Sequence, residues 1–226
     1  EKESRLALES HLYFKGWRRN SLDSRMGFQR IASLLQETAE GKKALIRGWV
    51  YRTRSSGGVA FVVVRDATGI IQCAVKKDQV PEGELADAVK ALLESAVEVE
   101  GTVKKDGRAP GGYELQAASF KVKQFAHVFP ISKDQSPEFL LDVRHLWIRS
   151  RELTAAAKVK SSVLEAARAF FKKEGYFETT PPIIVSGATE GGSTLFEFNY
   201  FGKKAFLSQS AQLYLEALIF SLEKVY

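Results

Sequence analysis

The chain has 226 residues, of which 45% are hydrophobic and 27% charged, with a net charge of +6. This composition predicts a globular protein of about one or two domains, and the basic excess favours either a polyanionic partner or a solvated basic surface. A single cysteine, Cys73, excludes a disulfide framework and a cysteine metal site. No apolar run approaches the ~20 residues that a membrane helix needs, and no signal-peptide core opens the sequence, so we predict a cytoplasmic protein without a membrane partner.

Residues 1–25 are predicted to be an N-terminal extension that precedes the first domain. They mix charges of both signs with scattered apolar residues, and they contain the basic cluster Lys15-Gly16-Trp17-Arg18-Arg19. The chain's only methionine, Met26, follows this stretch. An RNA-binding arm, a peripheral helix and a disordered tail all remain open as its role.

From residue 41 the pattern is typical of β-structure, and we assign residues 26–130 to one domain. Short β-branched and aromatic runs are separated by glycine-containing turns, and one helical pattern interrupts them. The predicted order is three strands, a helix and two strands, at residues 43–52, 59–65, 70–75, 81–95, 97–104 and 113–123. This is the order of the five-stranded OB barrel, a fold that binds single-stranded nucleic acid across its face and loops.

Residues 131–154 are predicted to form a hinge, and residues 155–226 a second domain. Apolar spacing predicts a helix over residues 155–173, with Gly175 as its stop signal. The stretch 176–185 reads as a strand that contains Pro181 and Pro182. Because proline cannot donate to a ladder, this strand should lie at a sheet edge, either within the chain or against a partner chain.

A carboxylate among glycines precedes the last predicted helix. Glu190 lies between Gly187 and the pair Gly191-Gly192, and apolar residues follow at helical spacing from Ala211 onward, with Ser208 or Ser210 as the N-cap. Glu190 and Gln212 could together hold an ammonium group, the carboxylate by charge and the amide oxygen by a hydrogen bond. The alternative is a surface loop and a core helix that carries a solvated glutamine.

These residues resemble the catalytic domain of class II aspartyl- and asparaginyl-tRNA synthetases of the archaeal and eukaryotic type. The similarity rests on Ala188-Thr189-Glu190-Gly191-Gly192, Leu195-Phe196, Tyr200-Phe201 and the run from Leu207 to Tyr214. The resemblance implies that Glu190 and Gln212 hold the α-ammonium of the amino-acid substrate. Aspartyl enzymes resemble one another in a lysine three residues after the motif glutamine. Here that position is Leu215. A neutral side chain offers aspartate no counter-charge and so favours asparagine; alternatively, Leu215 only continues the apolar side of the helix that starts near Ala211.

The barrel resembles the anticodon-binding domain of the same synthetases, through Gly48-Trp49-Val50, Arg65-Asp66, Gly69-Ile70-Ile71-Gln72 and Gly112-Tyr113-Glu114. In that family an aromatic ring stacks on an anticodon base, while a glutamine and a glutamate read base edges. By position these residues are Phe61, Gln72 and Glu114. Each could equally be ordinary barrel surface or core.

The resemblance implies an α+β protein, with an N-terminal OB barrel followed by the start of an antiparallel-sheet catalytic domain. The helix and strand that end near Pro182 resemble motif 1, which builds the homodimer interface in this family. Motifs 2 and 3, which carry the arginines of the ATP site, do not occur before Tyr226, so we expect an inactive fragment with no catalytic residue and no metal site of its own. The complete protein would use ATP and Mg²⁺ to join asparagine to its tRNA. An aspartyl or non-discriminating synthetase and a non-catalytic tRNA-binding chain are the alternatives.

Overall fold

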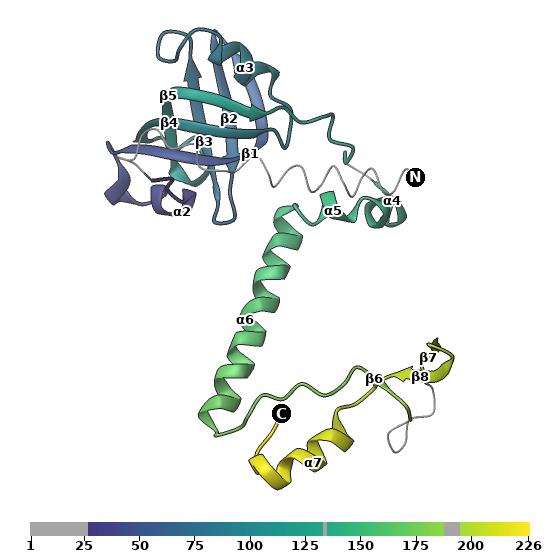
Figure 1. Cartoon of the computed structure of the whole chain (residues 1–226). Helices are drawn as coiled ribbons and strands as arrows, with labels where there is room; N and C mark the ends of the chain where they lie inside the picture. Colours follow the sequence, from purple (N-terminus) through teal and green to yellow (C-terminus); the bar gives the residue numbers. More distant parts are fainter. Residues whose placement is uncertain (1–26, 133–134, 188–194) are drawn as a thin grey trace. The chain divides into compact units, whose positions relative to one another are not determined.

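The computed structural model describes residues 27–132, 135–187 and 195–226 (Figure 1). Two predicted features lie outside the described residues: the extension 1–25 and Glu190. The chain divides into two compact units, with the boundary between Ser132 and Lys133. Each unit is described by itself below.

The first unit is a closed five-stranded barrel, which confirms the predicted fold (Figure 1). Its strands follow the order β1-β2-β3-β5-β4, with β1 and β4 paired antiparallel to close the barrel and β3 and β5 paired in parallel. The strands are β1 (Lys43–Ser56), β2 (Val59–Arg65), β3 (Ile70–Lys76), β4 (Ala96–Lys105) and β5 (Tyr113–Gln124).

Side chains that alternate along these strands fill the barrel. On β2, for example, Ala60, Val62 and Val64 are buried in the core, since successive side chains in a strand point to opposite faces. Phe120 on β5 is among the largest fully buried side chains of this unit. The outward-facing residues of the same strands are therefore available for binding.

Two glycines allow strands to pass closer to one another than any side chain would permit. A Cβ on Gly48 would lie 2.3 Å from the carbonyl oxygen of Arg65, and a Cβ on Gly101 would lie 2.2 Å from that of Gln116. Both distances are far below van der Waals contact, so the backbones at these points require glycine.

The helix between β3 and β4 is shorter than residues 81–95, so that prediction was wrong at both ends. Helix α3 runs only over Glu84–Lys90. It begins after Gly83, whose φ of 85° is left-handed, and it ends where Ala91 becomes extended. Glu94, at φ 71°, is held in a turn by its N–H bond to the carbonyl of Val50. This tertiary bond overrides the helical spacing that continued to Leu92.

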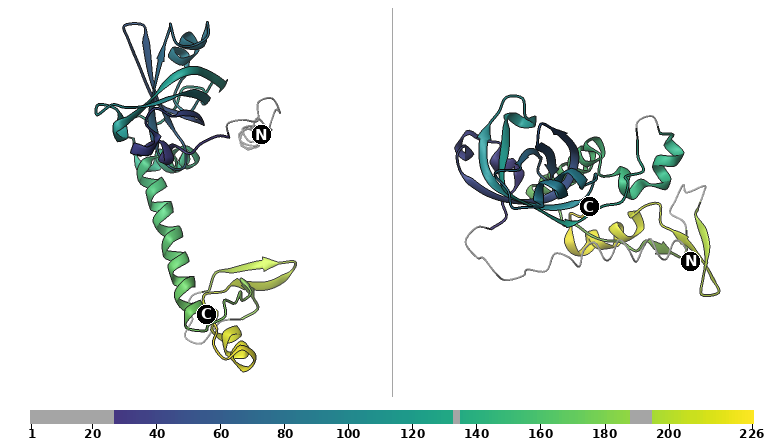
Figure 2. Two further views of the ribbon diagram at one scale, coloured as in Figure 1. Left: turned by 90° about the vertical axis from the view of Figure 1, so that its left-hand side faces the viewer. Right: turned by 90° about the horizontal axis from the view of Figure 1, so that it is seen from above.

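A short N-terminal segment closes the end of the barrel opposite α3 (Figures 1 and 2). It contains helix α2 (Ile31–Leu34) and the 3-10 turn η1 (Glu37–Ala39). The carboxylate of Asp66, in the β2–β3 turn, accepts hydrogen bonds from the N–H groups of Ile31, Thr68 and Gly69 and from the Thr68 hydroxyl, at 2.6–3.0 Å. Burial alone would raise the pKa of Asp66, but these bonds outweigh it and hold the pKa below its ordinary value.

Asp66→Asn is expected to lower the free energy of unfolding by about 1–3 kcal/mol, because three backbone N–H groups, two of them part-buried, lose a charged acceptor. A depressed carboxyl pKa stabilises the fold above the unfolded value, near pH 4, and that contribution disappears as pH falls through the folded pKa. The difference between the two proteins should therefore shrink on acidification, as denaturant unfolding at several pH values would measure. The matched control is Asp78→Asn, in an exposed turn. An equal loss in both variants would contradict the role of Asp66.

The second unit contains four helices and a three-stranded sheet among its described residues. The sheet order is β6-β8-β7, with both pairs antiparallel. The elements are α4 (Pro137–Asp142), α5 (Arg144–Trp147), α6 (Arg151–Lys173), β6 (Ile184–Val185), β7 (Glu197–Tyr200), β8 (Lys203–Leu207) and α7 (Gln212–Leu222).

Three sequence predictions about this unit need correction. Helix α6 begins at Arg151 rather than at residue 155, because the Ser150 hydroxyl accepts the N–H of Leu153 and caps the helix earlier. The predicted strand 176–185 is reduced to the two residues of β6, preceded by a single bridge at Phe177, because Pro181 and Pro182 interrupt any ladder. The β7–β8 hairpin was not predicted.

The apolar side of α6 is exposed in this unit. Val159, Val163 and Phe170, which lie on this side, are each about 60% exposed. Among the described hydrophobic residues of the second unit, Ala205 alone is buried. The described residues of this unit therefore leave the apolar side of the amphipathic helix α6 uncovered.

Candidate functional site

The barrel brings together the three residues predicted to recognise RNA bases. Phe61, Gln72 and Glu114 lie on β2, β3 and β5, which are consecutive neighbours in the barrel. Gln72 is opposite Val63 on one side and paired with Glu114 on the other. Residues adjacent in sequence, including Val62, Cys73 and Leu115, are in the core. The three predicted side chains therefore project from one outer face, which we call the β2–β3–β5 face.

Gln72 and Glu114 form a side-chain pair within this face. The Gln72 amide nitrogen Nε2 donates to the Glu114 carboxylate oxygen Oε2 at 3.2 Å. Their exposed fractions are only 5% and 7%. Gln72 has a second side-chain partner, Arg54, through its amide oxygen.

Arg54 completes the arrangement, and sequence analysis did not identify it. Its guanidinium carbon lies 4.6 Å from the centroid of the Phe61 ring, and its Nη2 donates to Gln72 Oε1 at 3.4 Å. The predicted strand ended at residue 52, which placed Arg54 in a turn. In the structure β1 continues to Ser56, and the register places Arg54 directly opposite Phe61. Phe61 itself is half-buried and is not part of the core.

An ion pair lies at the end of β2. Arg65 and Glu94 are joined at 2.6 Å with side chains only 18% and 11% exposed, and the Arg65 guanidinium lies 5.0 Å from the Trp49 ring centroid. The fork of Arg65 contacts both carboxylate oxygens, a geometry that fixes both side chains. This cluster holds the turn at Glu94 and supports the edge of the face.

Cys73 faces the opposite way, into the barrel. Burial, with a smaller contribution from the Glu114 charge, raises the pKa of the Cys73 thiol far above its ordinary range. The thiol therefore stays protonated and is neither a nucleophile nor a metal ligand.

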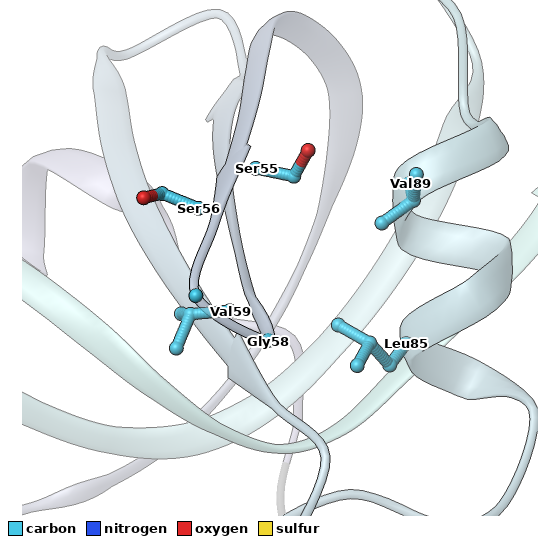
Figure 3. Close-up of a pocket in the computed structure, with 7 residues that line it drawn as sticks. Ser55, Ser56, Gly58, Val59, Leu85 and Val89 are labelled. Atoms are coloured by element: carbon cyan, nitrogen blue, oxygen red, sulfur yellow. The ribbon is translucent and has the colours of Figure 1, made fainter.

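A hollow of about 280 Å³ lies between the β1–β2 hairpin and α3 (Figure 3). Leu85 and Val89 project from α3 toward the hairpin residues Ser55 to Val59. None of its lining residues is titratable, so this hollow supplies no acid, base or metal ligand.

In the second unit, Gln212 is exposed in the first turn of α7. The N-cap of α7 is Ala211, which makes no side-chain cap bond, so the prediction of Ser208 or Ser210 as the N-cap was wrong. Ser210 Oγ nevertheless accepts the Gln212 backbone N–H at 3.1 Å, and Gln212 Nε2 donates to Glu216 Oε1 at 3.0 Å. This pairing leaves the amide oxygen of Gln212 as the group that faces away from Glu216. Glu216 was not identified from sequence, although its i, i+4 spacing from Gln212 was visible there.

A cavity of about 300 Å³ lies beside these residues, between β6, β8 and the start of α7. Leu213 and Tyr214 line it, but neither Gln212 nor the half-buried Leu215 does. Glu190 lies outside the described residues. Of the predicted substrate residues, the two that the structure describes, Gln212 and Leu215, do not line this cavity, and the roles of all three stay predictions.

Within residues 27–132, 135–187 and 195–226, no three His, Cys, Asp or Glu side chains are grouped so as to hold a metal ion. No helix in the described part of the chain is long and apolar enough to cross a membrane.

Each of the two units matches a known protein family. Residues 136–226 match the family of class II tRNA synthetases (D, K and N), and residues 44–122 match the OB-fold nucleic acid binding domain. The chain is 53% identical over 197 residues to the asparagine–tRNA ligase of Thermoplasma acidophilum, which covers 87% of this chain and 46% of that protein. The chain belongs to the class II aminoacyl-tRNA synthetases.

Other relatives are similar over the same region. The asparagine–tRNA ligase of Thermococcus gammatolerans is 53% identical, over 83% of this chain and 43% of that protein. The structure of Pyrococcus horikoshii asparaginyl-tRNA synthetase complexed with asparaginyl-adenylate has a TM-score of 0.82 and 46% identity, and covers 89% of this chain and 47% of that one. This chain thus spans less than half the length of these relatives.

Proposed function

We propose that this chain is part of an asparagine–tRNA ligase, an enzyme that activates asparagine with ATP and passes it to the 3′ end of its tRNA. The observation that carries this proposal is the 53% identity to asparagine–tRNA ligases across both units. The adenylate named in the Pyrococcus horikoshii complex supports ATP and asparagine as reactants. Mg²⁺ and a cytoplasmic location complete the proposal, although the described residues offer no cluster for the metal.

In this proposal the β2–β3–β5 face binds the tRNA anticodon. An unpaired base offers a π-face that stacks on Phe61 and an edge that meets the amide of Gln72. In the structure the Arg54 guanidinium, which is planar and donates hydrogen bonds, lies over the Phe61 ring and bonds to Gln72. A base could take the same position, which supports the proposal that this face binds one. The net charge of +6 favours the phosphate backbone around it.

Phe61→Ala is expected to weaken binding of an RNA hairpin that carries the asparagine anticodon by about 1–3 kcal/mol, because a stacking surface is lost. Affinity of both proteins should fall as salt rises, since phosphate contacts release counterions. Fluorescence anisotropy with the 226-residue chain would measure both effects. Phe125→Ala, an exposed phenylalanine that follows β5, is the matched control. Unchanged affinity of the Phe61 variant would remove this residue from the binding face.

The second unit is proposed to contribute the amino-acid site. Glu190 and the amide oxygen of Gln212 would hold the substrate ammonium, and the neutral Leu215 would leave aspartate without a counter-charge. Activation of this kind depends on positioning and on electrostatic stabilisation of developing charge, so no general base is assigned.

An aspartyl or non-discriminating synthetase is the second candidate, and Leu215 argues against it because a lysine would be expected there. A non-catalytic RNA-binding role is the third, favoured by a closed barrel with its own core. Pyrophosphate exchange into ATP separates them: asparagine dependence supports the first, aspartate dependence the second, and no exchange by the full-length protein the third.

We also propose that Pro182 and α6 lie at a homodimer interface. The apolar side of α6 and the exposed Pro182 and Ile183 are the surfaces that a second copy would cover. The oligomeric state of the full-length protein in solution tests this assignment.

A further inference from the structure

A fully buried hydroxyl group holds the chain where it leaves the barrel. The exit segment, residues 125–132, follows the end of β5. The N–H group of Ala126 donates to Ser95 Oγ at 3.0 Å, and Ser95 is fully buried. Ala126 is half-buried, whereas Phe125 and His127 on either side of it are exposed. The exit segment is therefore bonded to the barrel at Ala126, beyond the last strand.

The side chain makes this bond because the backbone of Ser95 has other partners. Its N–H bonds to the carbonyl of Leu92 at 3.1 Å, and its carbonyl accepts the N–H of Val50 on β1 at 2.9 Å. The β4–β5 ladder reaches only to Ala96. The Ser95 hydroxyl thus supplies the acceptor that a longer ladder would have provided. Alanine at this position would leave the Ala126 N–H without that acceptor.

The acceptor itself is held by residues of two strands. Glu94, which precedes Ser95, has a left-handed φ of 71°, and its N–H bonds to the carbonyl of Val50 at 2.7 Å. Its carboxylate pairs with Arg65 on β2 at 2.6 Å, and the Arg65 guanidinium lies over Trp49 on β1. A left-handed conformation at a residue other than glycine persists only where the surrounding structure determines it. Ser95 Oγ therefore has a fixed place in the barrel.

We propose that Ser95 is a positioning residue, which sets the direction in which the exit segment leaves the barrel and so couples RNA binding by the first unit to aminoacyl transfer in the second. This inference rests on the proposed ligase function. A tRNA bound by its anticodon must also deliver its 3′ end to the amino-acid site, and the exit segment joins the two units in the chain. A connection with fewer accessible conformations raises the effective concentration of the second site once the first is occupied.

Ser95→Ala in the 226-residue chain tests the local part of the proposal. The Ala126 amide should exchange its hydrogen about tenfold faster in the variant, while amides of the β4–β5 ladder keep their rates. Binding of an RNA hairpin with the asparagine anticodon should change by less than about twofold, because the hydroxyl lies away from the β2–β3–β5 face. The matched control is Ser119→Ala, which removes a hydroxyl of β5 that donates to Glu84 Oε1 at 3.1 Å. It should leave exchange at Ala126 unchanged.

The same variants in the full-length protein test the coupling. In Ser95→Ala, asparagine-dependent pyrophosphate exchange should stay within about twofold of the unmodified rate, whereas kcat/KM for charging of tRNA should fall about five- to fiftyfold. Ser119→Ala should keep both activities. Ser95→Cys retains a side chain of similar shape with a weak acceptor, so its charging rate and its exchange at Ala126 should both be intermediate.

The other outcomes contradict the proposal in different ways. Unchanged exchange at Ala126 would show that the hydroxyl does not hold the exit segment, and unchanged charging would show that the segment's direction does not matter. Equal losses in hairpin binding and in charging would show that Ser95 serves only the structure of the barrel. Each of these results would overturn the coupling role and leave the ligase function standing. If the unmodified full-length protein charges no tRNA with asparagine, the proposed function fails, and the coupling role fails with it.

Discussion

Replacement of Gln212 by alanine in the full-length enzyme is expected to lower kcat/KM for asparagine activation by about ten- to hundredfold. The proposed amide-oxygen contact is made to a charged ammonium, and hydrogen bonds to charged groups contribute about 1.5–3 kcal/mol. Gln212 is exposed and its side chain bonds only to Glu216 among the described contacts, so the fold should tolerate the change. Asparagine-dependent pyrophosphate exchange measures the effect.

Ser221→Ala, near the other end of α7, provides the control for that experiment. Its hydroxyl bonds only locally, to the carbonyl of Leu218, so activation should be unchanged. A wild-type rate in the Gln212 variant would exclude this residue from the amino-acid site. It would leave the binding role of the barrel unaffected.

Phe120→Ala is expected to lower the free energy of unfolding of the barrel by about 3–5 kcal/mol. A fully buried phenylalanine loses its transfer free energy and leaves a cavity in a close-packed core. Phe120 pairs with Val99 in the closed β4–β5 ladder, and both residues are fully buried in the core. Hydrogen exchange of the barrel amides under native conditions measures the loss.

Phe125→Ala is the matched control, since the same side chain is removed from an exposed position beyond β5. We expect a change of less than about 0.5 kcal/mol there, as is usual for surface substitutions. A similar small change in Phe120→Ala would contradict its assignment as a central core residue.

The local pattern of residues was sufficient for the identity and order of the barrel elements. Alternating apolar residues and glycine-rich turns depend only on neighbours in the chain, so the five strands and the helix between them were all found. The motif residues around Gln212 were sufficient for the family. Strands and helices can be recognised from the spacing of apolar residues within a short stretch of sequence.

Element ends and side-chain partners depended on contacts between distant residues. The helix expected over residues 81–95 stops at Lys90, because Glu94 bonds across to β1 and pairs with Arg65. The expected strand over residues 176–185 is mostly irregular, because its prolines remove ladder donors. The contacts of Glu94 are not visible in the local sequence, whereas the two prolines are, and their effect on the strand was underestimated.

The sequence by itself determined which residue types the candidate site would use: an aromatic ring, an amide and a carboxylate at Phe61, Gln72 and Glu114. Only the tertiary structure decided that Arg54 joins them, that Gln72 bonds to Glu114, and that Glu114 is too buried to be a simple surface group. The physical reason is register. Which side chains meet across β1, β2, β3 and β5 is set by how distant strands align when the barrel closes, and a shift of one residue would send each of them to the other face.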